Sequence, residues 1–163
     1  MQNSWSVIKR DLEENLLCDK LKGRVKYIIK SDNKKVVYIK VDGIERNIEA
    51  LKDKKVIQQQ DEQNTIKENG LDSIYMLKAI KEYKRSNFNN SLYSHNPLIR
   101  MLAIMDKRVT PKLTEKLTKE LKNQPDWLKY FYKLRFDIEN IPYEDEKEVE
   151  LEEAKQEEAT VTV

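Results

Sequence analysis

Few side chains in this sequence have the types and spacing that chemistry requires. The chain has one histidine, His95, and one cysteine, Cys18. Both Ser-His-Asp and Cys-His catalysis would have to use His95, and a metal site built on two histidines cannot form within one chain. Cys18 lies among leucines, and such an apolar setting raises the pKa of a thiol. We therefore expect no catalytic residue, no metal site and no cofactor, although an enzyme without a recognisable motif stays open.

Phosphate-cradling loops and cysteine-based sites are excluded by composition. The glycines are Gly23, Gly43 and Gly70, and neither a GxGxxG nor a Walker pattern runs through them. A single cysteine excludes an internal disulfide, a CxxC pair and a multi-cysteine zinc site. The acidic residues of the first 136 positions are scattered among basic ones, so no carboxylate pair is marked out for acid–base work.

Three arginines could bind an anion. Arg100 and Arg108 lie within and just after an apolar helix expected at 97–107, and Arg135 lies in the last predicted helix. A planar guanidinium suits a phosphate or a carboxylate, so these residues are candidate binding residues. The alternative, which we favour, is a structural charge cluster at helix ends, in which Asp106 pairs with Arg108 or Arg135.

A β-hairpin is the best candidate for a nucleic-acid surface. Residues 24–30 and 35–41 are rich in Val, Ile and Tyr and predict two strands joined by a turn. Alternation gives one apolar face and one basic face, the latter formed by Lys26, Lys30, Tyr38 and Lys40, with Lys34 and Lys35 in the turn. Cations beside an aromatic ring are typical of single-strand binding. Lysines also protect hairpins against edge pairing, so this reading has a structural alternative.

The remaining patterns predict the elements that position these residues. Apolar spacing predicts a helix over 5–21, a short third strand at 44–48, and helices over 71–85 and 97–107. Two further helices start at the prolines Pro111 and Pro125, the first with a seam of Leu113, Leu117 and Leu121. The polar stretch 49–69 fits either a helix or a mobile connector.

We therefore predict an α+β fold, with an N-terminal helix and a two- to three-stranded antiparallel hairpin unit packed with a C-terminal helical bundle. One domain would span residues 1–140, divided into a helix–hairpin unit (1–48), a polar connector (49–70) and a helical half (71–140). Residues 141–163 would form an acidic disordered tail, because they offer little to bury.

Charge is unevenly distributed along the chain. The net charge is +2, but residues 137–163 hold 11 acidic and two basic residues, so the first 136 positions hold 29 basic and 18 acidic ones. One interpretation is a soluble domain with a solvated tail. The other is a basic surface that binds a polyanion or an acidic protein, with the tail as an intramolecular competitor.

Location follows from the absence of long apolar segments in the sequence. No run approaches the roughly 18–20 apolar residues needed to span a bilayer. The first residues lead into a charged amphipathic segment and not into an apolar leader. Together with a single free thiol, these features predict a cytoplasmic protein that makes no membrane contact.

Three blocks of sequence resemble a known family. They are LCDKLKGRV at 17–25 with the following hairpin, NPLIRMLAIMDKR at 96–108, and FYKLR at 131–135. The chain resembles, over roughly residues 5–140, a family of small uncharacterised bacterial proteins. The resemblance implies the order helix, hairpin and helical half, and a bacterial origin. It implies no activity, cofactor or catalytic residue.

The functional prediction combines these points. We expect a non-enzymatic cytoplasmic protein-interaction module, such as an adaptor or an immunity-like inhibitor, whose basic surface binds an unidentified protein partner. The alternative is a nucleic-acid-binding accessory protein whose acidic tail is autoinhibitory.

Overall fold

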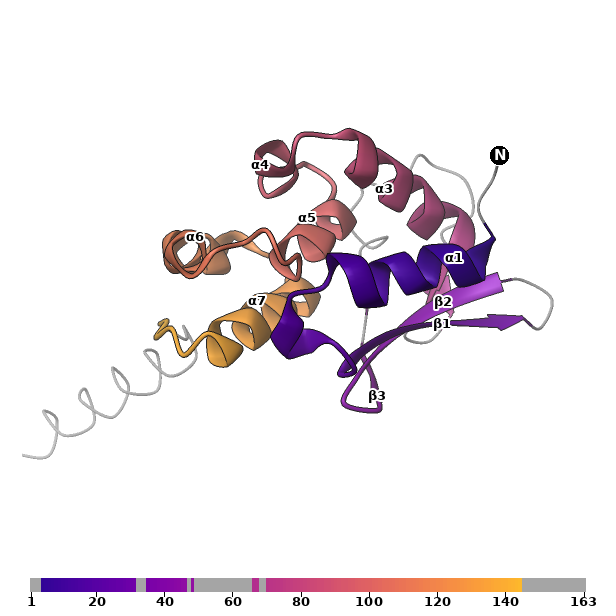
Figure 1. Ribbon diagram of the computed structural model, residues 1–163, viewed down its shortest axis with the longest axis horizontal. Helices are drawn as coiled ribbons and strands as arrows, with labels where there is room; N and C mark the ends of the chain where they lie inside the picture. The colour runs from indigo at the N-terminus through magenta and orange to yellow at the C-terminus, as the bar shows by residue number, and fades with distance from the viewer. Residues whose placement is uncertain (1–3, 32–34, 47, 49–65, 68–69, 145–163) are drawn as a thin grey trace, which may run out of the picture.

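A computed structural model describes residues 4–31, 35–46, 48, 66–67 and 70–144. Its elements follow the predicted order of N-terminal helix, β-hairpin and helical half, which confirms the α+β class (Figure 1). Most of the predicted connector, residues 49–65 and 68–69, lies outside the described residues, as does the predicted tail from residue 145 onward.

The N-terminal helix is shorter than its apolar pattern predicts. Helix α1 (Trp5–Arg10) continues as the π-helical segment η1 (Asp11–Leu16), and a separate 3₁₀ turn, η2, covers Asp19–Leu21. The predicted helix over 5–21 is wrong at Leu17, which pairs in a β-bridge with Asp106. The Cys18 N–H donates to the carbonyl of Met105 at 3.0 Å. These bonds stop the helix because they use the backbone groups that a further turn would need.

The hairpin forms as predicted and is the centre of a larger sheet. Strands β1 (Val25–Ser31) and β2 (Lys35–Val41) pair antiparallel, from Val25 opposite Val41 to Ser31 opposite Lys35. Asp42 and Gly43 both have positive φ, 53° and 81°, as a tight two-residue turn requires, and β3 (Ile44–Arg46) returns along β2.

Two short strands were missed by the sequence analysis. Strands β4 (Ile66–Lys67) and β5 (Gly70–Asp72) extend the sheet in the order β1-β2-β5-β4, with β3 also pairing β2. Residues 66–67 and 70 are therefore strand and neither helix nor connector, and the helix predicted over 71–85 starts only at Ser73 because residues 71–72 belong to β5. The physical reason is that a lone hairpin leaves the second edge of β2 unpaired, and β5 fills part of that edge.

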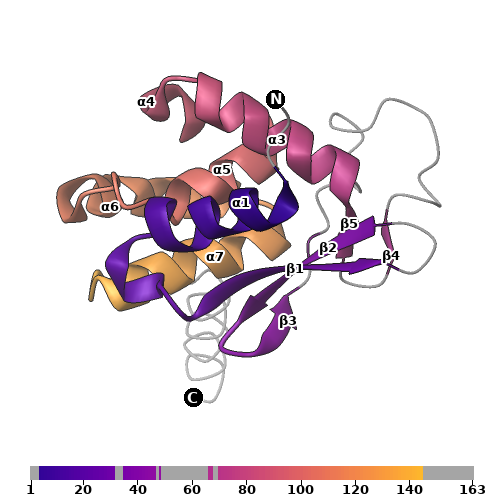
Figure 2. The same cartoon turned by 45° about the vertical axis from the view of Figure 1, so that its right-hand side comes forward.

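One face of the sheet is a buried apolar surface. Its residues Val25, Tyr27, Val37, Ile39 and Val41 are at most 1% exposed. At the outer edge of β1, the Tyr27 N–H donates to the carboxylate of Glu13 at 2.7 Å, and Lys9 pairs with the same carboxylate at 2.5 Å. The edge strand is thereby joined to the N-terminal helix, which crosses beside it (Figure 2).

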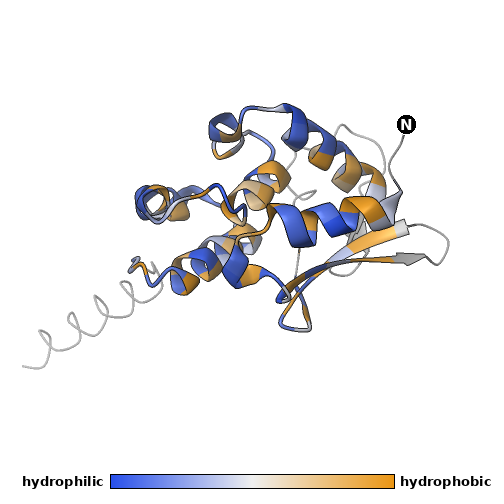
Figure 3. Cartoon of the chain, in the orientation of Figure 1, coloured by the Kyte–Doolittle hydropathy of each residue, from blue (hydrophilic) through white to orange (hydrophobic). Residues whose placement is uncertain are grey.

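The helical half is built around one apolar helix. It comprises α3 (Ser73–Arg85), α4 (Phe88–Ser91), α5 (Pro97–Ile104), α6 (Pro111–Leu117), the 3₁₀ segment η4 (Thr118–Asn123) and α7 (Asp126–Ile138). Helix α5 lies between α3 and α7 and is largely apolar, whereas the outer surface of α6 is hydrophilic (Figure 3). None of the described helices is long and apolar enough to cross a membrane.

Side-chain caps fix where two of these helices start. The Asn96 Oδ1 accepts the Leu98 N–H at 3.0 Å, and the Thr110 Oγ1 accepts the Leu113 N–H at 3.2 Å, each just before a proline at the first helical position. Helix α5 ends at Ile104 and not at the predicted residue 107, since the following residues make the bridge to the N-terminal segment.

Candidate functional site

A buried aspartate organises the turn after α5. Asp106 is 1% exposed. Arg108 donates to both of its carboxylate oxygens, through Nη2 at 2.9 Å and Nε at 3.0 Å, so the predicted ion pair between these residues forms. The Tyr83 hydroxyl donates to the same carboxylate from α3. The hydrogen bond to Asp106 raises the pKa of Arg108, and burial raises the pKa of Tyr83.

Arg135 completes this cluster from α7. Its side chain is among the largest that the fold buries completely. Nη1 donates to the carbonyl of Asp106 at 3.0 Å, Nη2 donates to the carbonyl of Val109 at 2.6 Å, and Nε lies 3.4 Å from the Glu139 carboxylate. The guanidinium thus satisfies carbonyls of the turn between α5 and α6, which is a structural role.

Arg100 is held at a different place. Its Nη1 donates to the carbonyl of Ser94 at 2.6 Å, and its Nε donates to the Gln124 side chain at 3.0 Å. Arg108 and Arg135 therefore meet at Asp106, whereas Arg100 contacts the loop before α5. Within the part of the chain that the structure describes, no contact joins all three arginines around a shared anion position.

The basic face of the hairpin is smaller than expected. Lys26 is exposed and lies opposite the half-buried Lys40 across β1 and β2. Tyr38 is 7% exposed, so the expected stacking ring is absent from the surface. Strand β2 is central, with β1 along one edge and β3 and β5 along the other, so Tyr38 has a neighbouring strand on each side. Lys30 lies in β1, but its side chain is outside the described set.

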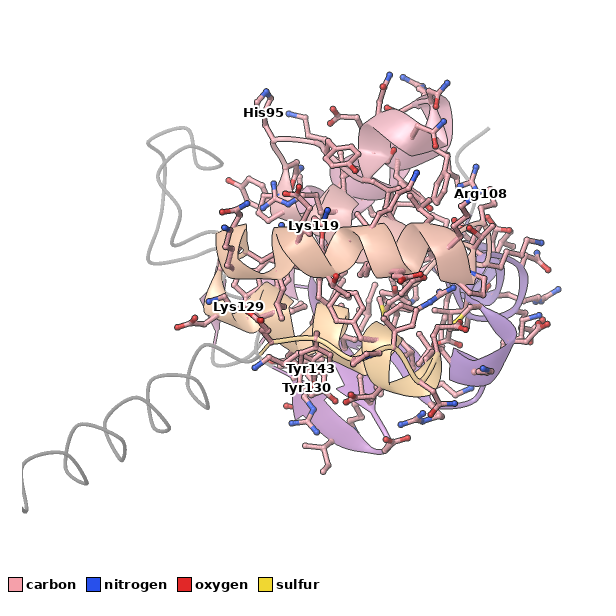
Figure 4. The ribbon with its side chains drawn as sticks, turned by 90° about the vertical axis from the view of Figure 1, so that its left-hand side faces the viewer. His95, Arg108, Lys119, Lys129, Tyr130 and Tyr143 are labelled. Atoms are coloured by element: carbon pink, nitrogen blue, oxygen red, sulfur yellow. The ribbon has the colours of Figure 1, made fainter. Side chains whose placement is uncertain are left out.

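The two side chains considered first for catalysis, Cys18 and His95, differ in solvent exposure. Cys18 is buried, and that burial raises the pKa of its thiol, as the sequence predicted. His95 is exposed in the loop before α5 (Figure 4), where it lines a surface cavity of about 390 Å³. Among the described residues, no group of three His, Cys, Asp or Glu could hold a metal ion.

A feature that the sequence analysis missed is a line of lysines on the outer side of α6 and η4. We call it the lysine row, and its exposed members are Lys112, Lys116, Lys119 and Lys122. Spacings of four, three and three residues place these side chains along one side of a helix that is α-helical and then 3₁₀. Figure 4 looks onto this helix, which lies foremost with Lys119 labelled.

The row has few acidic neighbours on its own helix. Glu115 is exposed in α6, and Glu120 is half-buried and lies within 3.4 Å of the Asn123 amide. On the opposite, apolar side of this helix, Leu117 and Leu121 are buried as expected. The helical spacing of the lysines is visible in the same stretch of sequence, residues 112–122, and would have predicted this exposed basic side of the helix.

A cavity of about 640 Å³ adjoins the end of the row. Lys119 and Lys122 lie on the η4 side, and Pro142, Tyr143 and Glu144 lie on the other. The Tyr143 and Phe136 ring centroids are 5.4 Å apart, which joins the segment after α7 to that helix. The last described residues of the chain therefore run beside the lysine row.

The fold and these surfaces define an α+β protein in which a helix and an antiparallel sheet precede a helical half with an exposed basic edge. Residues 4–47 and 44–136 match the model of the SF0329 protein family. Because these matches cover most of the sequence, the chain belongs to that family, for which no activity is known. No curated protein and no solved structure matches the chain significantly.

Proposed function

We propose that this protein is a non-catalytic interaction module of the bacterial cytoplasm, an adaptor or an inhibitor of a partner protein. It recognises an acidic segment of that partner through the lysine row. The observation that carries this proposal is the contrast between two sets of cations. The arginines at 100, 108 and 135 are engaged by groups of the chain itself, whereas the four lysines of the row are exposed.

Electrostatics supports an acidic partner. Eleven residues of mixed α- and 3₁₀-helix, from Lys112 to Lys122, carry the row over about 15–20 Å, which is long enough to meet several carboxylates of an extended peptide. Clustered charge of one sign raises the local concentration and the association rate of an oppositely charged partner. The resulting binding is weakened by salt, because exposed charges are screened beyond about 8 Å at 0.15 M ionic strength.

The test uses a defined probe. Binding of fluorescently labelled poly-L-glutamate to the full chain is measured at 20 mM and 150 mM salt. The variant K116Q/K119Q should weaken binding about tenfold at low salt, an order-of-magnitude expectation of roughly 0.7 kcal/mol for each lost surface charge. The matched control K78Q/K81Q removes two exposed lysines from α3 and should change binding less than twofold. Equal losses in both variants would contradict the proposal.

A second candidate function is nucleic-acid binding, favoured by the exposed Lys26 facing Lys40 across the hairpin. Its distinguishing measurement is the affinity for a single-stranded oligonucleotide. If this function holds, K26Q/K40Q should weaken oligonucleotide binding, while K116Q/K119Q should not. The slope of log binding constant against log salt concentration should also become shallower by about 0.7 for each lost phosphate contact. The loss of Tyr38 as a stacking ring counts against this candidate.

A further inference from the structure

We propose that the chain's own acidic segment, residues 145–163, occupies the lysine row and competes with the partner. This inference rests on the proposed function, because it assigns a regulator to the same surface. It goes beyond the sequence-based idea of a competing tail by naming the surface on which the tail binds, which is α6 and η4 and not the hairpin.

The last described residue, Glu144, lies beside the lysine row. The segment begins directly after Glu144, which lines the same cavity as Lys119 and Lys122. Upstream, the Ile141 N–H donates to the carbonyl of Phe136 at 2.9 Å, and the Tyr143 ring packs on Phe136. The acidic segment is therefore attached to the folded part at the end of the lysine row. A tether this short gives an effective concentration of about millimolar, so even weak contacts are made in cis.

The acidic segment also matches the lysine row in charge and in length. Residues 145–158 contain eight acidic residues and two lysines. Fourteen residues can extend up to about 46–50 Å, whereas the row spans about 15–20 Å, so the segment is long enough to run from Lys122 back to Lys112. The segment therefore carries more acidic residues than are required to pair with the four lysines of the row, even though Glu115 lies beside those lysines.

A direct test is zero-length carbodiimide crosslinking of the full chain, mapped by mass spectrometry. Crosslinks from carboxylates of residues 145–158 should fall mainly on Lys116, Lys119 and Lys122 at 20 mM salt and decline at 500 mM salt. Lys26 on β1 and Lys81 on α3 are exposed reference amines. An even distribution of crosslinks over the row and the reference lysines would overturn the proposal.

A competition measurement separates this inference from the proposed function. The full chain with the tail substitutions E148Q/E150Q/E152Q/E153Q, called the neutralised tail, should bind poly-L-glutamate about tenfold more tightly than the wild type does. The control E14Q/E82Q/D126N/D137N makes the same change in net charge at exposed sites elsewhere and should gain less than threefold. Adding K119Q/K122Q to the neutralised tail should remove the gain.

The outcomes are distinguishable. Equal gains in the tail variant and its control would mean that only net charge matters, and the inference fails. No gain in the tail variant, together with binding that still depends on Lys116 and Lys119, also overturns the inference but leaves the proposed function standing. Absence of binding in every variant at low salt refutes both.

Discussion

The sharpest structural prediction concerns Arg135, which the sequence marked as a candidate binding residue. The substitution R135M keeps a long side chain but removes every donor. The Val109 carbonyl, which accepts from Nη2 at 2.6 Å, then loses this bond inside the protein, and the Asp106 carbonyl loses one of its donors. Hydrogen bonds to charged groups contribute about 1.5–3 kcal/mol each, so we expect a loss of about 3 kcal/mol in the free energy of unfolding.

The assay is equilibrium urea unfolding followed by tryptophan fluorescence, since Trp127 is buried on the same helix and reports on its packing. With a slope of about 2 kcal/mol per molar urea, the expected loss lowers the midpoint by about 1.5 M. The variant R135K, whose ammonium cannot reach both carbonyls with a planar fork, should lose about half as much. It keeps the test usable if R135M does not fold.

The matched control is R85M, which makes the same chemical change at an exposed position of α3 and should alter the free energy of unfolding by less than about 0.5 kcal/mol. A stability of R135M within that range would refute the structural role. Loss of poly-L-glutamate binding by R135M with unchanged stability would restore Arg135 as a binding residue.

Three further predictions follow from the same geometry. Y83F removes the hydroxyl that donates to buried Asp106 and should cost about 1–2 kcal/mol in urea unfolding, with α5 otherwise unchanged. For Asp11, burial raises the carboxyl pKa, but hydrogen bonds from Lys84 and Asn15 lower this pKa by more than burial raises it, so the net shift is downward. The stabilisation is therefore complete above the ordinary pKa and lost as pH falls below about 3.8, and D11N should lose less stability than wild type between pH 5 and pH 2.5. The buried Cys18 thiol should react with Ellman's reagent at the rate of global unfolding, and rapid native reaction would contradict its placement.

The sequence predicts the elements well where local signals agree. The cap and proline at Asn96 and Thr110 start helices where expected, and alternation in the hairpin assigns Val37 and Ile39 to the core. These features depend on nearest neighbours along the chain, so they are readable without a structure.

The errors lie where contacts between distant segments decide the structure. The helix over 5–21 stops at Leu16 because Lys107, 91 residues further on, donates its N–H to the Leu16 carbonyl. Strand β5 forms because the edge of β2 offers unpaired backbone groups. Neither partner is visible in the local pattern, which in the first case continues to favour a helix.

The same distinction explains why the role of each arginine could not be read from the sequence. An arginine near the end of an apolar helix looks like an anion site or like a helix-end partner, and only the position of carbonyls such as that of Val109 decides between them. Arg135 became structural because its planar fork can satisfy several oxygens at once in the interior, which an ammonium does less well.

Lysines follow the opposite rule. Their strongly hydrated ammonium groups resist burial, so a lysine repeated at helical spacing stays on the surface whatever the tertiary fold. The lysine row is therefore the part of the candidate site that the sequence could have specified, and the arginine positions are the part that it could not. The proposed function assigns the binding face to exposed lysines at i, i+4 and i+7 and not to arginines of apolar helices. If a variant that lacks all four lysines of the row still bound poly-L-glutamate tightly, through Arg100 and Arg108 alone, the assignment of the binding face to the lysine row would be wrong.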